Sequence, residues 1–496
     1  MPDFFPWWVV VTHFLNVFVM LLLARSGLEV LSAFPKLHWD DDCTPGREWL
    51  RLTRRRFSAE DPRPWSSLDE EEAWPSTVAL PGRKNLGLGR HWHFMSIQFW
   101  IVTGAAYIAL VIATGYWHYL VPTSWSIFPE AVRSVGSYLS FHYPPLLPGQ
   151  PFNAVQKLSY FAVVFLLGPL QIATGAAMSP AILARFPWYA RIFGGKQAAR
   201  SIHFLGLCAF AAFVFVHTVM VIIHGVPKEF AAIVLGSYGA SHPLALAVGL
   251  TGICLILVVH VGVTWFSLRY RRRTQRMLGW MVNPFERVVS RAFTSRQQRR
   301  PAAVSPYHRV NGYPPTSAEY DALVAGGFRD FRLPVGGLVT APGRFSLAEL
   351  RDLGLQSQVT MHNCIQGWTA TAEWTGVPLG ALLDQVQPMS DADTVALYAF
   401  DDKGETEGEG RWGFFYSTIP LWLARNPQTL LVLEMNGGPL PVQHGAPVRL
   451  RVESQLGFKM TKWVRGIELT HGYAHIGMGQ GGWREDQQFY ANAAGI

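Results

Sequence analysis

Five long apolar runs occupy the first half of the chain. They lie at about Phe4–Leu23, His93–Trp117, Leu158–Met178, Ile202–Val226 and Pro243–Leu268. A helix that crosses a bilayer needs about 20 apolar residues. Each run is flanked by Gly, Pro or charged residues, and tryptophans and tyrosines collect at the run ends, as they do at a membrane interface. The pattern therefore predicts an all-α, five-helix transmembrane bundle within residues 1–270.

The second half has a different pattern. From about Ser305 to Ile496, short β-type runs such as Thr429–Glu434 alternate with Gly/Pro turns, and short helical stretches such as Ser346–Leu353 and Leu379–Gln385 interrupt them. This pattern predicts an α+β, mostly β domain over residues 305–496. The arginine-rich residues 271–304 are expected to be a linker, and the charged stretch 25–90 to be a solvated loop.

The distribution of charged residues predicts how the chain is oriented in the membrane. The formal net charge is +8, and charged residues make up 15% of the chain, against about 25% in soluble domains. The basic residues cluster at the ends of apolar runs, which favours a membrane surface over nucleic acid as their partner. Arginines and lysines are most frequent on the side of the second half. The positive-inside rule then predicts a bacterial inner-membrane protein whose C-terminal domain is cytoplasmic, with the periplasm as the alternative.

Cysteine spacing and the N-terminus add two expectations. Cys43, Cys208, Cys254 and Cys364 form no CxxC pair and no disulfide framework. The first apolar run lacks both a basic start and a cleavage site, so no cleavable signal peptide and no twin-arginine signal are expected.

Histidines inside the apolar runs are the first candidate functional residues, because ionisable groups are costly in a bilayer. His203 and His217 are fourteen residues apart in one run, which is about 21 Å along a helix. Fourteen residues is nearly a whole number of turns, so both rings project from one face. Depth matching predicts that His13 pairs with His217 and His93 with His203, with His91 as the alternative to His93. Imidazole pairs of this kind suit haem iron; hydrogen-bonded packing between helices is the alternative.

The first half resembles the cytochrome b561-like b-type cytochromes that are membrane subunits of formate dehydrogenases and nickel–iron hydrogenases. The matching residues are His13 with Arg25-Ser26-Gly27, Arg90-His91-Trp92-His93, Gln156 to Tyr160 with Gly175, Ser201-Ile202-His203, and His217. The resemblance implies two b haems and electron exchange with membrane quinone. The long stretch 25–90 departs from the family and leaves the quinone site unassigned.

Two segments of the second half could carry chemistry. Cys364 lies in Met361-His362-Asn363-Cys364-Ile365-Gln366-Gly367-Trp368, where a lone cysteine is otherwise most often structural. Further on, glycines alternate with Arg449, Lys459 and Lys462. Backbone amides and fixed cations of this kind could hold a phosphate-bearing cofactor, and a surface hairpin is the alternative.

The second half resembles the sulfite oxidase-type molybdopterin oxidoreductases. The pattern is CIQGWT from Cys364, then EWTGVPL, then EMNGGPLPVQHGAPVRLRVESQLGFKMTKWVRGIEL. The resemblance implies that the Cys364 thiolate binds molybdenum and is the catalytic residue. It also implies that the pterin and its phosphate are held by Tyr307, His308, Asn311, His444, Arg449, Met460, Thr461 and Lys462. Arg309, Val310, Phe400 and Asp401 would be neighbours of this set.

One departure bears on the substrate. Where sulfite oxidases carry an anion-binding arginine, four residues after the cysteine, this chain has Trp368, as in the bacterial methionine-sulfoxide reductase branch. The expected active-site tyrosine has no clean counterpart, because Phe415 occupies the slot and Tyr416 is one residue away. An uncharged aromatic wall suits a neutral sulfoxide.

Together these features predict a membrane-bound molybdenum oxidoreductase. Electrons would pass from quinol through two b haems to a molybdopterin centre, which reduces a sulfoxide-like small-molecule substrate. The alternatives are a sulfite-type oxidase that reduces quinone, and a haem-b electron conduit for a partner protein. The predicted partners are membrane lipid and quinone, without nucleic acid, and a homodimer is considered.

Overall fold

The computed structural model describes residues 5–58, 60, 65–292, 303–402 and 414–495. Two compact units emerge from the contacts between residues. The first contains residues 1–25, 93–175 and 202–266, and the second contains residues 26–92, 176–201 and 267–496. Three segments of the predicted membrane half, or parts of them, therefore belong to the second unit.

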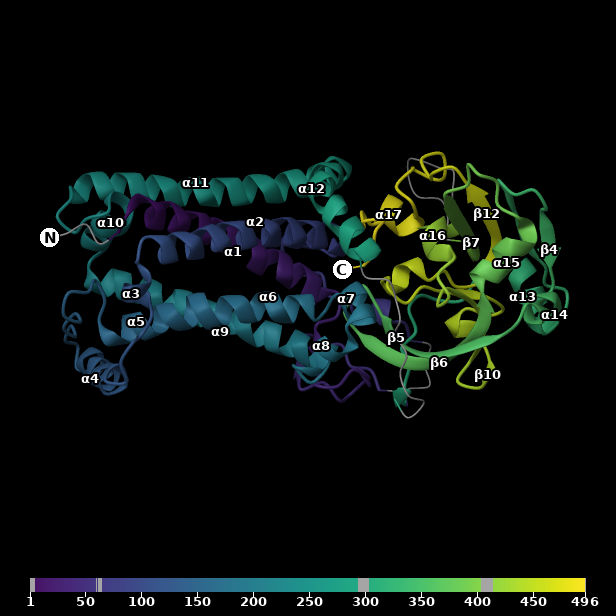
Figure 1. Cartoon of the computed structure of the whole chain (residues 1–496), viewed down its shortest axis with the longest axis horizontal. Coiled ribbons are helices and arrows are strands. Elements are labelled where there is room, and N and C mark those ends of the chain that lie inside the picture. The colour runs from purple at the N-terminus through teal and green to yellow at the C-terminus, as the bar shows by residue number, and fades with distance from the viewer. Residues whose placement is uncertain (1–4, 59, 61–64, 293–302, 403–413, 496) are drawn as a thin grey trace. The chain divides into compact units, whose positions relative to one another are not determined.

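The first unit is helical, and five apolar helical segments in the described part of the chain are long enough to cross a membrane. Figure 1 shows the long helices α1, α2, α6, α9 and α11 running side by side. The helices that build this unit or pass through it are α1 (Trp7–Ser32), α2 (Leu86–Ala113), α3 (Trp117–Leu120), α4 (Ile127–Leu139), α5 (Ala154–Phe161), α6 (Gly168–Ala176), α9 (Lys196–His224), α10 (Val226–Leu235) and α11 (His242–Arg269).

The composition of these helices explains the bundle. Val258 and Val261 on α11 are 66% and 70% exposed, and apolar side chains directed outward are what a lipid-facing helix presents. Between α5 and α6 the helix widens into a π turn at Ala162–Leu167. The turn precedes Pro169, whose ring excludes the usual backbone hydrogen bond. The five-helix prediction is confirmed.

Three helices begin or end beyond the apolar runs that predicted them, and one of them, α2, begins at Leu86. Helix α1 continues to Ser32 and α9 begins at Lys196. These extensions are polar and belong to the second unit. Hydropathy marks the lipid-facing part of a helix and cannot mark the part that is buried in protein.

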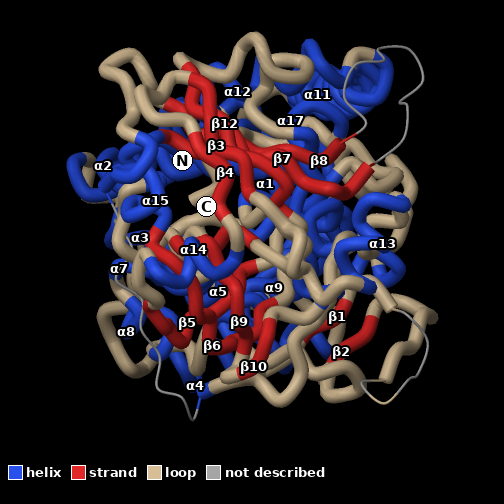
Figure 2. Tube along the Cα trace, turned by 90° about the vertical axis from the view of Figure 1, so that its right-hand side faces the viewer, coloured by secondary structure: helices blue, strands red, loops and turns tan. Residues whose placement is uncertain are grey.

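The second unit is built on two five-stranded sheets. One has the order β10-β9-β6-β5 with β11 also on β9, and the other has the order β4-β3-β12-β7-β8; Figure 2 shows the two groups of strands. All described pairs in these sheets are antiparallel except β3 with β12. The strands are β3 (Leu333–Gly337), β4 (Gly343–Phe345), β5 (Gln356–Asn363), β6 (Thr369–Pro378), β7 (Thr394–Asp402), β8 (Phe414–Pro420), β9 (Leu430–Met435), β10 (Gly438–Pro439), β11 (Arg449–Arg451) and β12 (Val464–Thr470).

Short elements surround these sheets. A separate pair, β1 with β2, is antiparallel. These elements are β1 (Lys36–Leu37), β2 (Leu50–Arg51), α7 (Pro180–Arg185), α8 (Pro187–Arg191), α12 (Arg271–Ala292), α13 (Ala318–Ala325), α14 (Leu347–Asp352), α15 (Leu379–Val386), α16 (Leu421–Ala424), α17 (Trp483–Gln487), and 3-10 turns at Ser67–Glu70, Val442–His444 and Gly457–Lys459. The mostly β prediction is confirmed.

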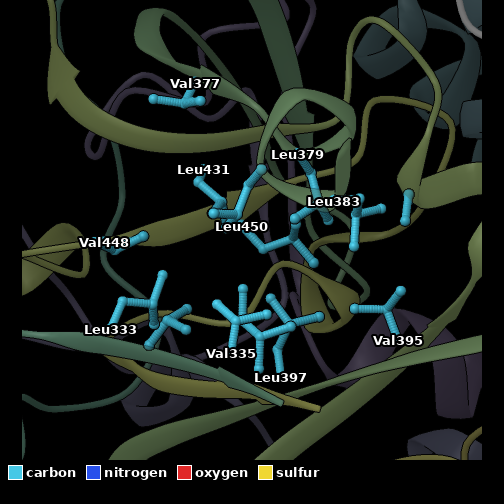
Figure 3. Close-up of a cluster of buried hydrophobic side chains, with 14 of the residues drawn as sticks. Leu333, Val335, Val377, Leu379, Leu383, Val395, Leu397, Leu431, Val448 and Leu450 are labelled. Atoms are coloured by element: carbon cyan, nitrogen blue, oxygen red, sulfur yellow. The ribbon is translucent and has the colours of Figure 1, made fainter. Parts of the chain in front are cut away.

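The main core lies between the two sheets. Figure 3 shows Leu333, Val335 and Leu397 of one sheet opposite Leu431 and Leu450 of the other, and all five are at most 2% exposed. Strand alternation places these side chains on the inner face of each sheet. Burial of this apolar area stabilises the domain that carries Cys364.

The stretch 25–90 is not the solvated loop that its charges suggested. Phe34, Lys36, His38 and Cys43 are at most 1% exposed. The charges are internal because they pair: Lys36 Nζ donates to Glu70 at 2.9 Å, and Arg309 donates to the other oxygen of the same carboxylate. Buried ion pairs of this kind leave no hydrophobic periodicity for a sequence pattern to show.

Residues 271–292 form helix α12 rather than an irregular linker, while residues 293–302 lie outside the described residues. The helix is amphipathic, with Leu278 and Val282 buried on one face. Glu286 is also buried, at 3% exposure, and burial raises the pKa of its carboxyl to about 8, which the nearby Arg90 charge opposes.

This buried carboxyl predicts a pH-dependent stability. The folded-state pKa lies above the unfolded value, so the stabilisation is present at low pH and is lost as the pH rises through about 8. We expect Glu286→Gln to remove an effect on the order of a few kcal/mol, so that the melting temperature of the detergent-solubilised chain falls less between pH 5 and pH 9 than in the wild type. Glu319→Gln, at a partly exposed carboxyl on α13, is the control. Equal slopes for the wild type and Glu286→Gln would contradict this account.

Candidate functional site

Two histidine pairs lie inside the helical unit. The ring centres of His13 (α1) and His217 (α9) are 6.3 Å apart, and those of His93 (α2) and His203 (α9) are 6.5 Å apart. Metal–imidazole nitrogen bonds are about 2 Å long, so two such bonds and the two half-widths of the rings span roughly 6 Å. Both pairs therefore fit a metal held between two opposed imidazoles.

The second pair also has a defined hydrogen-bond partner. The Thr174 hydroxyl lies 2.8 Å from the Leu170 carbonyl and 3.0 Å from His203 Nδ1. Because the carbonyl takes the hydroxyl proton, Nδ1–H of His203 donates to the hydroxyl oxygen. That tautomer leaves the Nε2 lone pair for a metal. At His13, Nδ1 is buried and has no hydrogen-bond partner among the described residues.

Three other histidines of the first half have different neighbours. His91 Nδ1 lies 2.8 Å from the Gly87 carbonyl of its own helix. His260 Nδ1 lies 3.2 Å from the Arg25 guanidinium, and His224 Nδ1 lies 3.6 Å from the Glu229 carboxylate. Each of these rings is engaged by the protein, whereas the two pairs above face one another.

In the second unit, Cys364 lies directly after β5 in a buried polar setting. Its Sγ is 3.7 Å from Asn311 Nδ2 and 3.5 Å from Gln366 Oε1. Gln366 Oε1 also accepts from Trp368 Nε1 at 3.1 Å. Burial raises the pKa of the Cys364 thiol to about 12, and the Arg484 charge opposes that shift.

Three of the predicted cofactor residues form a cluster with two residues that sequence reasoning had not assigned. The ring of His308 lies 5.1 Å from that of His444, 5.4 Å from Trp374 and 5.6 Å from His362. The Arg449 guanidinium carbon lies 4.8 Å from the centre of the Trp374 ring. Strands β5, β6 and β11, the 3-10 turn before β11 and the segment at His308 thus converge on one place.

The electrostatics of this cluster are those of an anion site. Burial lowers the pKa of Arg449 to about 9, with Arg451 adding to the effect, and lowers the pKa of His444 to about 3. The Arg449 Nε, His308 Nε2 and Trp374 Nε1 atoms are buried and have no hydrogen-bond partner among the described residues. Buried polar atoms are normally paired, so the cluster fits a ligand that is anionic and bears several hydrogen-bonding groups.

The other predicted cofactor residues make different contacts. Lys462 Nζ donates to the Asn311 carbonyl at 2.6 Å, Met460 Sδ accepts from Arg451 at 3.0 Å, and Thr461 Oγ1 lies 2.6 Å from Ser417 Oγ. Tyr307 packs its ring against Phe57, 6.0 Å away. Tyr307 is therefore the one member of the predicted set whose described contacts point to packing.

Glycines shape the walls of this site. Gly445 has a φ of +116°, and a Cβ there would come within 2.9 Å of Lys462 Cβ and 3.1 Å of Arg449 Cβ. Gly457 allows the backbone to approach the His362 ring, since a Cβ there would lie 2.4 Å from Nε2. Both positions need glycine for close approach.

Further buried charges of this unit come both from inside and from outside the mostly β sequence. Arg451 donates to His362 Nδ1 at 2.8 Å and pairs with Glu453 at 2.7 Å. Arg200, near the start of α9, donates to the carbonyls of Phe34 and Lys36. The i, i+2 spacing of Arg449 and Arg451 on one strand could have signalled a shared face; no comparable signal marks Arg200.

Two family models match separate parts of the chain. Residues 5–236 match the family model of prokaryotic cytochrome b561, and residues 323–475 match that of the oxidoreductase molybdopterin binding domain. Both resemblances predicted from the sequence are confirmed.

Curated relatives match parts of the chain. YedZ1 of Azospira oryzae, named as a protein-methionine-sulfoxide reductase subunit, is 35% identical over 32% of this chain and 54% of its own. The protein-methionine-sulfoxide reductase catalytic subunit MsrP of Xanthomonas axonopodis pv. citri is 36% identical over 27% of this chain and 44% of its own. The chain thus spans about half the length of each.

A solved structure, the sulfane dehydrogenase SoxCD from Paracoccus pantotrophus, is 22% identical over 29% of this chain and 39% of its own, with a TM-score of 0.25. That score is too low to support an argument. The two family matches carry the assignment: the chain contains a prokaryotic cytochrome b561 domain at residues 5–236 and an oxidoreductase molybdopterin-binding domain at residues 323–475.

Proposed function

We propose that this chain is a membrane-bound molybdenum oxidoreductase that takes electrons from quinol through two b haems and reduces a sulfoxide. One observation carries the proposal. His203 and His217 lie on one helix, and each faces a histidine from another helix at 6.3 to 6.5 Å between ring centres. Two pairs at two depths support a two-step electron path through the membrane unit.

The chain's own residues have distinct roles in this proposal. His13 with His217 and His93 with His203 would hold iron from both sides, and Thr174 would orient His203. Bound haem supplies one-electron transfer, and bound molybdopterin supplies oxygen-atom transfer. The protein fixes ligand geometry and excludes water.

The molybdopterin side of the proposal rests on the buried cluster. Cys364 would provide the thiolate ligand, and Asn311 would hold its sulfur in place. Arg449, Lys462 and the neutral imidazoles of His308 and His444 would receive the phosphate and the pterin, because they offer a buried cation and unpaired polar atoms. Met460 and Thr461 would shape the wall through their contacts with Arg451 and Ser417.

The residue at position 368 favours a neutral sulfoxide over an oxyanion as the substrate. Trp368 is 1% exposed and its Nε1–H is directed at Gln366, so this position offers no charge to a dianion. The relatives named as methionine-sulfoxide reductases support the same substrate class. Stopped-flow reoxidation of the reduced haems by methionine sulfoxide, set against reduction of the haems by sulfite, separates this direction from its reverse.

Each histidine pair predicts a haem that can be lost separately. We expect His217→Leu or His13→Leu to lower the haem content from two to one per chain, because each removes one axial ligand of the same iron. His203→Leu or His93→Leu should remove the other. Pyridine haemochrome assay of purified chain measures the ratio, and His260→Leu is the control that keeps both. Retention of two haems in the His217 and His203 variants would refute the pairing.

The Cys364 thiol predicts a loss of activity that is separate from any loss of haem. Cys364→Ser should abolish sulfoxide reduction while both haems remain, because a hydroxyl is a much weaker molybdenum ligand than a thiolate. Cys43→Ser, at the other buried cysteine of this unit, is the matched control and should retain molybdenum. Turnover by Cys364→Ser within twofold of wild type would rule out the assignment.

We infer from the arginine distribution that the molybdopterin domain is cytoplasmic. A green fluorescent protein fused after Ile496 should then fluoresce, and alkaline phosphatase at the same position should be inactive, in whole bacterial cells. The opposite pair of results would place the domain in the periplasm.

A further inference from the structure

A second cation lies beside Cys364, from a part of the chain far away in sequence. Arg484 on α17 donates through Nη2 to Asn311 Oδ1 at 3.4 Å, and the amide nitrogen of Asn311 lies 3.7 Å from Cys364 Sγ. A single side chain, Asn311, therefore separates the guanidinium from the sulfur. The segment that follows Cys364 has no charged side chain at position 368, where Trp368 stands.

No carboxylate lies within ion-pair distance of Arg484 among the described residues, although its charge does act on the Glu71 carboxyl, whose pKa burial raises and Arg484 lowers. Its other described hydrogen bond goes from Nη1 to Gln488 Oε1 at 2.5 Å, and no ion pair involves it within the described part of the chain. Buried cations elsewhere in this unit do have carboxylate partners, as in Lys459 with Glu485 and Arg451 with Glu453. Arg484 is half-buried and its described side-chain hydrogen bonds go to neutral amides, so no ion pair holds the guanidinium away from a ligand.

A cavity of about 100 Å³ lies near this arginine, although neither Arg484 nor Cys364 is among its lining residues. Gln488, the partner of Arg484, lines the cavity, and so does Glu71, which accepts a hydrogen bond from Gln366 at 2.8 Å. Both amide partners, Asn311 and Gln366, contact the sulfur of Cys364. A space of this size with polar walls can hold several waters. Hydrogen-bonded side chains connect its wall to the thiol, through Gln366 on one side and through Arg484 and Asn311 on the other.

We propose that Arg484 binds the oxygen atom of the S–O substrate beside Cys364. The proposal rests on the function proposed above. Position 368 has a tryptophan and no cation, so in this proposal the cation that binds the substrate oxygen comes from the C-terminal segment.

The chemistry requires such a donor. Reduction of a sulfoxide breaks the S–O bond and takes up two electrons and two protons, giving a thioether and water. Bound molybdopterin would supply the two electrons, and solvent would supply the two protons. Negative charge increases on the oxygen as the bond breaks, so a fixed guanidinium donor stabilises the transition state. Arg484 keeps its own proton throughout.

The kinetic test compares Arg484→Gln and Arg484→Lys with Arg351→Gln, an arginine at the surface of the same unit that pairs with Glu434. We expect kcat/KM for methionine sulfoxide to fall by about 10- to 100-fold in Arg484→Gln, the loss expected for one charged hydrogen bond. Arg484→Lys should recover part of it, and Arg351→Gln should match the wild type. Molybdenum content should be unchanged; its loss in Arg484→Gln would make Arg484 a cofactor residue and overturn the proposal.

A second readout does not need turnover. In full-length chain produced without molybdopterin, the rates of alkylation of Cys364 by iodoacetate and by iodoacetamide are measured by peptide mass spectrometry. The ratio of the two rates should fall severalfold in Arg484→Gln, because the cation attracts the anionic reagent, and should stay constant in Arg351→Gln. An unchanged ratio together with unchanged kcat/KM would sink the proposal. A wild type that reduces no sulfoxide but shows the ratio change would instead count against the proposed function alone.

Discussion

A polar group removed from water must find a partner, and both sites of this protein follow from that constraint. In the helical unit the constrained groups are imidazoles within apolar helices. In the mostly β unit they are a guanidinium, an indole and imidazoles that form a buried cluster in the same unit as the Cys364 thiol. In each case the polypeptide brings the groups together and leaves specific atoms unpaired. Those atoms define what the ligand must offer: two coordination bonds in one unit, and negative charge with several hydrogen-bonding groups in the other.

The same constraint explains why the contact-based units differ from the family boundaries. Polar extensions of α1, α2 and α9 and much of the stretch 26–92 pack with the molybdopterin-binding sequence. The buried Lys36–Glu70 pair and the Arg200 bonds to backbone carbonyls satisfy charges that would otherwise be exposed. The surroundings of Cys364 are thus built from both halves of the chain.

The spans and the histidine pairing could be predicted because helices are periodic and local. An apolar run sets the length of a helix, and fourteen residues set the relative direction of His203 and His217. The mostly β class and its short helices were readable from turn residues for the same reason. The burial of residues 33–43 was not readable, since their partners, such as Glu70, Arg309 and Thr369, are distant in sequence.

Arg484 illustrates the limit most clearly. Its helix has only five residues, its sequence neighbours carry no motif, and its distance in sequence from Cys364 hides the contact through Asn311. Trp368 marks a missing charge in the sequence, but only the fold shows which residue could replace it.

The central claim is that one chain holds two irons in its helices and one molybdenum at its thiol. The most direct test is haem and metal quantification on the purified full-length chain, by visible spectroscopy and mass spectrometry of the elements. The account predicts two b-type haems and one molybdenum per polypeptide. A single haem, or a well-folded chain that lacks molybdenum when produced in cells that make the cofactor, would contradict it.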